Sequence, residues 1–115
     1  MTDAKAISKF VRVSPKRARM VAEKLRGRSV DEALLEAQFT NSKAARVIYK
    51  TLESAIANAE HNFDMDVDEL IVHEATVDKG PVLKRMKPRA RGRADIMRKP
   101  TSHITVVVRE REDES

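Results

Sequence analysis

Hydrophobic residues along the 115-residue chain recur with two different periods, which separate helical segments from extended ones. The clearest segment follows Asn41, where apolar residues recur at helical spacing over about five turns. These residues are Ala45, Ile48, Leu52, Ala55, Ile56 and Ala59. The pattern ends near residues 61–62, and its alanine content predicts a helix that packs closely over a thin core.

Two shorter helices are predicted before it. Ser14 and Pro15 are typical of a helix start, because serine caps the first turn and proline needs no N–H at the first position. This helix is expected to end at Gly27, and Ser29 with Glu32 has capping-box spacing for the next one. The apolar stripe of the first helix comprises Ala18, Val21, Ala22 and Leu25, and that of the second comprises Val30, Ala33, Leu34 and Ala37.

Three segments are predicted to be extended. Residues 4–13 alternate imperfectly, whereas residues 70–77 and 103–108 alternate clearly. On residues 70–77 the expected inward face is Ile71, Ala75 and Val77, and on residues 103–108 it is Ile104, Val106 and Val108. The pattern therefore predicts three helices and three extended segments in one chain.

The stretch PVLKRMKPRARGRA, residues 81–94, contains six basic residues, two prolines and no acid. It lies between two predicted strands, so the simplest connection is a hairpin. At ~3.3 Å per residue, an arm formed by residues 79–101 would extend roughly 35 Å, with a turn at Arg91–Gly92. We therefore predict one domain, with a body of approximately residues 1–78 and 102–115 and this protruding arm.

The net charge of +5 is unevenly distributed. Residues 5–28 and residues 79–99 each carry nine basic residues and one acid, whereas residues 29–78 carry three basic residues and eleven acids. Two basic blocks around an acidic body predict a surface that binds a polyanion. The candidate residues in the arm are Lys79, Lys84, Arg85, Lys87, Arg89, Arg91, Arg93, Arg98 and Lys99. Those in the body are Lys9, Arg12, Lys16, Arg17, Arg19, Arg26 and Arg28.

Other function classes find little support. The chain has no cysteine, no apolar run long enough to span a membrane and no signal peptide, so a soluble cytoplasmic protein is the default expectation. One Tyr and three Phe argue against a single-strand binder that stacks bases on aromatic side chains. We expect no catalytic, metal or cofactor site, because the histidines are dispersed and the Asp64–Asp66–Asp68 series lacks the residues that complete an EF-hand.

Two alternatives remain open on residues alone. The first is an architectural DNA-binding protein whose basic β-arm inserts Pro88 into the minor groove. The second is a small metal-dependent enzyme that uses the acidic series with the histidines, of which His73 and His103 are expected to approach one another across two strands.

Four segments in order resemble the L-twenty-two family of large-subunit ribosomal proteins, of the bacterial type. They are SPKRARMVAEKLRG, TLESAIANAEHN, GPVLKRMKPRARGRA and TSHITVVV, and they span nearly the whole chain. The first residues and the acidic tail REDES lie outside these motifs.

The resemblance implies a structural constituent of the large subunit in the cytoplasm, which binds rRNA of several domains and acts early in assembly. The implied fold is α+β, with three helices packed on a small three-stranded antiparallel sheet and a long protruding β-hairpin. The body would lie near the mouth of the polypeptide exit tunnel, and the arm would line the tunnel wall beside the L-four protein and the nascent polypeptide. No membrane or small-molecule substrate is implied. Ser14 would join the rRNA-binding residues of the body. The tip at the tunnel wall would comprise Leu83, Lys84, Arg85, Arg89, Arg91, Gly92 and Arg93.

Overall fold

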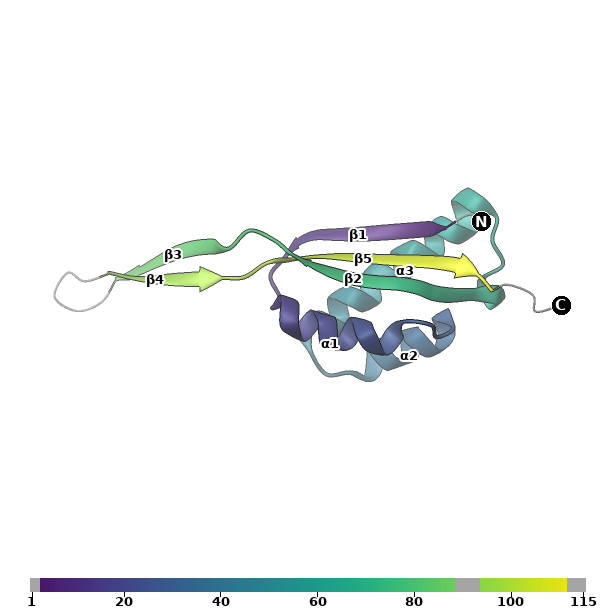
Figure 1. Ribbon diagram of the computed structural model, residues 1–115, viewed down its shortest axis with the longest axis horizontal. Helices are drawn as coiled ribbons and strands as arrows, with labels where there is room; N and C mark the ends of the chain where they lie inside the picture. Colours follow the sequence, from purple (N-terminus) through teal and green to yellow (C-terminus); the bar gives the residue numbers. More distant parts are fainter. Residues whose placement is uncertain (1–2, 89–93, 112–115) are drawn as a thin grey trace.

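The computed structural model describes residues 3–88 and 94–111, with side chains for residues 3–84 and 99–111. The molecule measures 71 × 25 × 19 Å, and its radius of gyration of 17.4 Å exceeds the roughly 13 Å of a compact domain of this length. A two-stranded hairpin extends from one end of a helix-and-sheet body, while β1 begins and β5 ends at the opposite end (Figure 1). The predicted α+β fold with its three helices and three-stranded sheet is confirmed.

The sheet of the body is antiparallel, with strand order β1–β5–β2. The three strands are β1 (Ala4–Val11), β5 (Ser102–Glu110) and β2 (Leu70–Lys79). The predicted inward face of β5 is confirmed, because Ile104, Val106 and Val108 are all buried. These three residues lie at the centre of the sheet and form the floor of the core.

The predicted inward face of β2 was wrong at one position. Val72 pairs with Val108 and Glu74 pairs with Val107, so His73 is an extra residue in a β-bulge. Since side chains alternate along a strand, one extra residue exchanges the two faces. Val72 is therefore buried with Ala75 and Val77, whereas Ile71 is only half-buried.

A second bulge shortens β1 relative to the predicted 4–13 segment. Ser8 pairs with Ile104 and Val11 pairs with Ser102, so two residues of β1 face only His103. Phe10 lies in this bulge with a φ of 57°, in the left-handed region. A short turn, closed by the Val13 N–H on the Val11 carbonyl at 2.9 Å, then leads directly into the first helix.

The three helices begin and end close to the predicted positions. They are α1 (Pro15–Leu25), α2 (Val30–Phe39) and α3 (Lys43–Phe63). Ser29 and Ser42 accept hydrogen bonds from the backbone N–H groups of Glu32 and Ala45, whereas the side chain of Ser14 makes no capping bond. Gly27 follows α1 with a φ of 79°, a conformation that favours glycine.

The core lies between the sheet and the helices. Helix α3 packs across β1 and β5, α1 packs on β2, and α2 packs on both of these helices. The predicted stripe of α1 is buried in full, as are Ala33 and Ala37 of α2 and most of the predicted face of α3. Many of these residues are alanines, which permit the close approach of helix and sheet that the sequence indicates.

Backbone and side-chain donors cover the outer edges of the sheet. Along β2, the Gly27 N–H binds the Val72 carbonyl at 2.8 Å and the Val72 N–H binds the Arg28 carbonyl at 2.9 Å. On β1, the Asn58 amide donates to the Lys5 carbonyl at 3.0 Å. Such cover protects exposed edge strands from pairing with other chains.

The hairpin comprises β3 (Leu83–Pro88) and β4 (Ala94–Lys99), which form an antiparallel sheet of their own. We call residues 80–82 and 100–101, which join it to the body, the neck. Within the neck, the Gly80 N–H binds the Thr101 carbonyl at 2.9 Å and the Thr101 hydroxyl donates to the Pro81 carbonyl. Next to it, the buried Ser102 hydroxyl donates to the Val13 carbonyl at 2.8 Å. The hairpin is thus attached to both β2 and the start of α1. The predicted turn at Arg91–Gly92 lies outside the described residues.

Leu52 tests the core assignment, because its side chain is fully buried on α3. Replacing Leu52 with Ala removes buried methyl groups, so the free energy of unfolding should fall by ~2–5 kcal/mol. Leu35→Ala is the matched control, since Leu35 is 54% exposed on α2, and its effect should stay within about 0.5 kcal/mol. Urea unfolding followed by circular dichroism measures both values, and equal losses would contradict the assignment.

Gly80 tests the packing of the neck. A Cβ at this position would lie 2.5 Å from the Thr101 Oγ1. Gly80→Ala should therefore destabilise the protein by about 1–3 kcal/mol, the usual effect of overpacking. Thr101→Ala removes the clashing hydroxyl, so the double variant should be more stable than the sum of the two single effects predicts. Thermal unfolding of the three variants measures these effects. If the destabilisation of the double variant equals the sum of the two single effects, the contact between residues 80 and 101 does not determine the packing.

Candidate nucleic-acid interface

Cationic side chains gather where the arm meets the body. Two hollows, of about 190 and 230 Å³, share a lining of Arg12, Val13, Ser14 and Lys43. The first hollow is also lined by Arg17 and by residues at the start of α3. The second is also lined by Lys99 and Pro100. Four basic residues and no acid line these hollows, and they come from the residue after β1, from α1, from α3 and from the end of the arm. We call this the neck cluster: Arg12, Arg17, Lys43 and Lys99.

The order of the elements explains why these residues meet. Strand β1 runs towards the arm, so α1 begins at the arm end of the body, and α3 begins there too. Backbone N–H groups at the start of a helix are partly unsatisfied and carry a positive partial charge. Together with the four cations, two helix starts make this end of the body electrically suited to phosphate groups.

Sequence reasoning placed Arg12, Ser14, Arg17 and Lys99 among the candidate residues, and the structure brings them together. It missed Lys43, which lies within the acidic part of the sequence. No local pattern identifies Lys43, because its role depends on α1 and α3 beginning at the same end of the body.

Two candidate arginines of α1 contact the edge of β2. The Arg19 Nε donates to the Val77 carbonyl at 3.1 Å, and the Arg26 Nε donates to the Ala75 carbonyl at 3.0 Å. Arg28 forms an ion pair with Glu36 at 3.9 Å. Arg19 and Arg26 therefore help to hold α1 on the sheet, whereas the Arg28 side chain contacts α2. The contribution of all three residues to RNA binding stays a prediction. Lys16 and Lys9 are exposed.

The arm places like-charged residues opposite each other. Its register pairs Lys84 with Arg98 and Arg85 with Met97, and the one acid of the arm, Asp95, pairs with Lys87. Like charges directly opposite each other destabilise a strand pair unless an anion intervenes. Among the arm candidates with described side chains, Lys79 and Lys84 are exposed and Lys99 is half-buried, as is the predicted tip residue Leu83.

Three predicted residues of the arm are described by their backbone alone. Arg85, Lys87 and Arg98 belong to β3 and β4 by their backbone. The remaining predicted residues of the arm and tip lie outside the described residues: Arg89, Arg91, Gly92 and Arg93.

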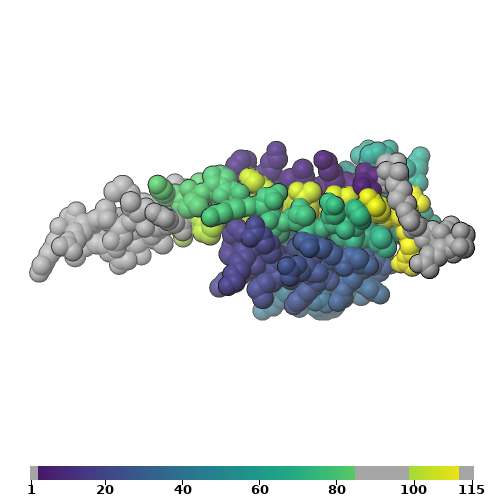
Figure 2. Space-filling model, viewed as in Figure 1, coloured from purple at the N-terminus to yellow at the C-terminus, as the bar shows by residue number. Residues whose placement is uncertain are grey.

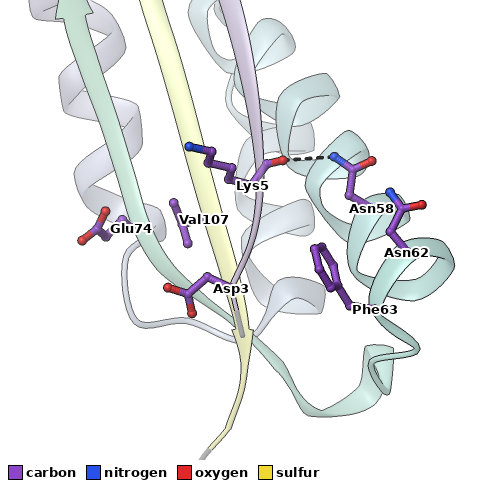
Figure 3. Close-up of a pocket in the computed structure, with 7 residues that line it drawn as sticks. All are labelled: Asp3, Lys5, Asn58, Asn62, Phe63, Glu74 and Val107. Carbon is purple, nitrogen blue, oxygen red and sulfur yellow. Dashed lines mark hydrogen bonds between the residues drawn. The ribbon is translucent and has the colours of Figure 1, made fainter. Parts of the chain in front are cut away.

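A larger hollow of about 500 Å³ lies beside the far end of β1 and α3. Figure 3 shows its lining, which includes Asp3, Lys5, Asn58 and Glu74. Two carboxylates against one ammonium group make this hollow poorly suited to a polyanion. Arg109 also donates to both carboxylate oxygens of Asp3, at 2.8 and 2.9 Å, and this hydrogen bonding holds the pKa of Asp3 below its ordinary value.

The histidines and the acidic series have structural contacts. His103 on β5 pairs with Asp78 on β2. Asp78 is five residues after His73, so the two histidine positions are roughly 16 Å apart along the sheet at strand spacing. The expected approach of His73 to His103 was therefore wrong. Asp66 accepts a hydrogen bond from the Asp68 N–H at 3.0 Å and begins the short 3-10 turn Val67–Glu69. In the described part of the chain, no group of three or more acidic or histidine side chains is arranged to hold a metal ion.

The described helices include none with the length and apolar character needed to cross a membrane.

Comparison with known proteins places this basic, two-part molecule in a family. The model of the family "Ribosomal protein L22p/L17e" matches residues 6–109. A "Large ribosomal subunit protein uL22" of Fusobacterium nucleatum is 64% identical over 106 residues, covering 92% of this chain and 96% of the relative. Proteins of the same name from Syntrophomonas wolfei and Desulforamulus reducens are 56% and 57% identical, and each alignment covers 96% of this chain and 97% or 98% of the relative.

The class is thus a ribosomal protein rather than an enzyme. The chain belongs to the L22p/L17e family of ribosomal proteins, as its four sequence segments indicate.

Lys43 offers a test of the neck cluster. Lys43→Glu should weaken binding to deproteinised large-subunit rRNA and reduce the slope of log K against log salt concentration by about 1 or more. An acid in the first turn of α3 favours the helix dipole, so the loss will not come from unfolding. Lys50→Glu, two turns further along α3 and near Glu53, is the matched control. Equal binding by the two variants in filter-binding assays would remove Lys43 from the interface.

Proposed function

We propose that this chain is a structural component of the large ribosomal subunit, held there by large-subunit rRNA. The body binds rRNA through the neck cluster, and the arm enters the RNA. The observation that carries this proposal is the arm itself: a strand pair extends from the body with nine basic residues and one acid between residues 79 and 99. Its family membership supports the same assignment.

The shape of the molecule favours enclosure by RNA over surface binding. The long axis, at 71 Å, is nearly three times the next dimension, and a thin strand pair of this kind is marginally stable without a surrounding surface. Phosphate groups on both sides supply counter-charges to Lys84 and Arg98, whose positions face each other in the register. Arg side chains suit such contacts because their guanidinium groups bind phosphate oxygens in pairs.

The resemblance of the four sequence segments to the family supports a finer assignment. In this proposal the body lies near the mouth of the polypeptide exit tunnel, and the arm passes between several rRNA domains during early assembly. The tip then forms part of the tunnel wall, next to the L-four protein and the nascent polypeptide. The ribosomal location places the protein in the bacterial cytoplasm.

The DNA-binding alternative receives no support from the comparisons, because the matched family and the relatives are ribosomal proteins. A single ordered domain with a rigid body and one arm would also need a partner copy to clamp a duplex from two sides, and no observation favours one.

A double charge reversal in the arm tests the proposal. Lys84→Glu with Arg85→Glu should greatly reduce incorporation into large subunits, since four units of charge change where phosphates are expected. The body should fold normally, because β3 lies outside the core.

The matched control is Arg46→Glu with Lys50→Glu, which makes the same charge change on the exposed side of α3 near α2. Tagged variants are expressed beside the wild-type protein, and their amounts in purified large subunits are compared. Incorporation of the arm variant at the level of the control would contradict RNA enclosure of the arm.

A further inference from the structure

Phe10 has a conformation and an exposure that the core does not explain. It lies in the β1 bulge with a φ of 57°, and 62% of its surface is exposed. A left-handed conformation is rare for a bulky aromatic residue and persists only where the surroundings fix it. An apolar ring held outwards at this energetic cost points to a contact outside the chain.

His103 fixes Phe10 in this position. The Phe10 backbone N–H donates to the His103 Nδ1 at 3.1 Å. The two rings meet edge to face, with centroids 4.9 Å apart and planes at 87°. In a T-shaped pair the edge of one ring meets one face of the other, so at least one face of Phe10 is left open by His103. The bulge therefore presents a preorganised, flat apolar surface.

The surroundings of Phe10 are cationic. Lys9 precedes it and is exposed, and Arg12 of the neck cluster follows two residues later. Phe63, another exposed phenylalanine, has a different setting. It ends α3 and lines the hollow that contains Asp3 and Glu74.

We propose that Phe10 stacks on an unpaired base of large-subunit rRNA, while Lys9 and Arg12 contact the phosphates on either side of that nucleotide. This inference rests on the proposed rRNA binding and adds a specific contact to it. Proteins recognise RNA loops by stacking splayed-out bases on aromatic side chains, and the interaction tolerates any base. The shortage of aromatics argues against a platform of several rings, but one ring suffices for one base.

Tryptophan fluorescence tests the stacking directly, because the chain contains no tryptophan. Phe10→Trp retains a stacking ring and introduces a single fluorophore at the site. Titration with deproteinised large-subunit rRNA should quench its emission strongly. Phe63→Trp, at a residue that is 49% exposed beside Asp3 and Glu74, is the control for absorption by the RNA and for non-specific binding, and it should be quenched weakly. Equal quenching of the two variants would overturn the proposal.

Affinity gives the second measurement. Phe10→Leu retains an apolar side chain but has no π-face, so its affinity for the rRNA should fall about 5- to 150-fold. Its salt dependence should equal that of the wild type, because no charge is lost, whereas Arg12→Gln should reduce the salt slope. Phe63→Leu should bind as the wild type does. Thermal unfolding of each variant establishes that the body is folded.

The outcomes separate this inference from the proposed function. If the wild type binds the rRNA and Phe10→Leu binds equally well, the stacking contact is refuted and the proposed function stands. If Phe10→Trp is not quenched although Phe10→Leu is lost from large subunits, Phe10 contacts a neighbouring protein, which also refutes stacking. If the wild type does not bind the rRNA, both proposals fail.

Discussion

The arm carries cations without a hydrophobic core of its own, and much of the molecule is arranged around that constraint. Its register sets Lys84 against Arg98, and one acid accompanies nine basic residues between residues 79 and 99. A strand pair of this composition is stabilised by an external anion rather than by burial of its own side chains. The body is different, since sheet and helices enclose a continuous core that includes Ile48, Leu52 and Ile104. One chain thus combines a self-sufficient body with an extension that needs a partner.

The body determines where and how the arm leaves it. Gly80 and Thr101 approach so closely that a side chain at Gly80 has no room, and the Ser102 hydroxyl binds the Val13 carbonyl just before α1. The same end of the body holds the starts of α1 and α3 and the neck cluster. Figure 1 shows that α1 begins at the end of the body from which the arm extends, and in Figure 2 its dark blue atoms lie beside the green atoms that lead into the arm. A polyanion that encloses the arm therefore meets positive charge again at its base. Arg19 and Arg26 are not in the neck cluster. Their Nε atoms donate hydrogen bonds to carbonyl groups at the edge of β2.

Local signals in the sequence predicted most of the fold. Serine and proline at helix starts, Gly27 after α1 and the spacing of apolar residues on α3 each depend on neighbours within a few positions. The two bulges were not predictable in this way. Each adds one residue to a strand, at His73 and in the Lys9–Phe10 pair, and only the register with β5 reveals it. The candidate site likewise combines local and tertiary features. The basic blocks were evident in the sequence, whereas Lys43 could be identified only once the structure showed that α1 and α3 begin at the same end of the body. The contacts of Arg19 and Arg26 with β2 equally depend on tertiary packing.

The central claim is that rRNA encloses the arm rather than merely attracting a basic surface. The most direct measurement is sedimentation of the tagged protein from extract of its native cells, followed by a high-salt wash of each ribosomal fraction. Contacts at an exposed surface weaken steeply with salt, whereas a strand pair surrounded by RNA cannot leave without opening the RNA around it. Retention on the large subunit after the wash is the expected result. Release at moderate salt, or migration with DNA or as free protein, would contradict the account.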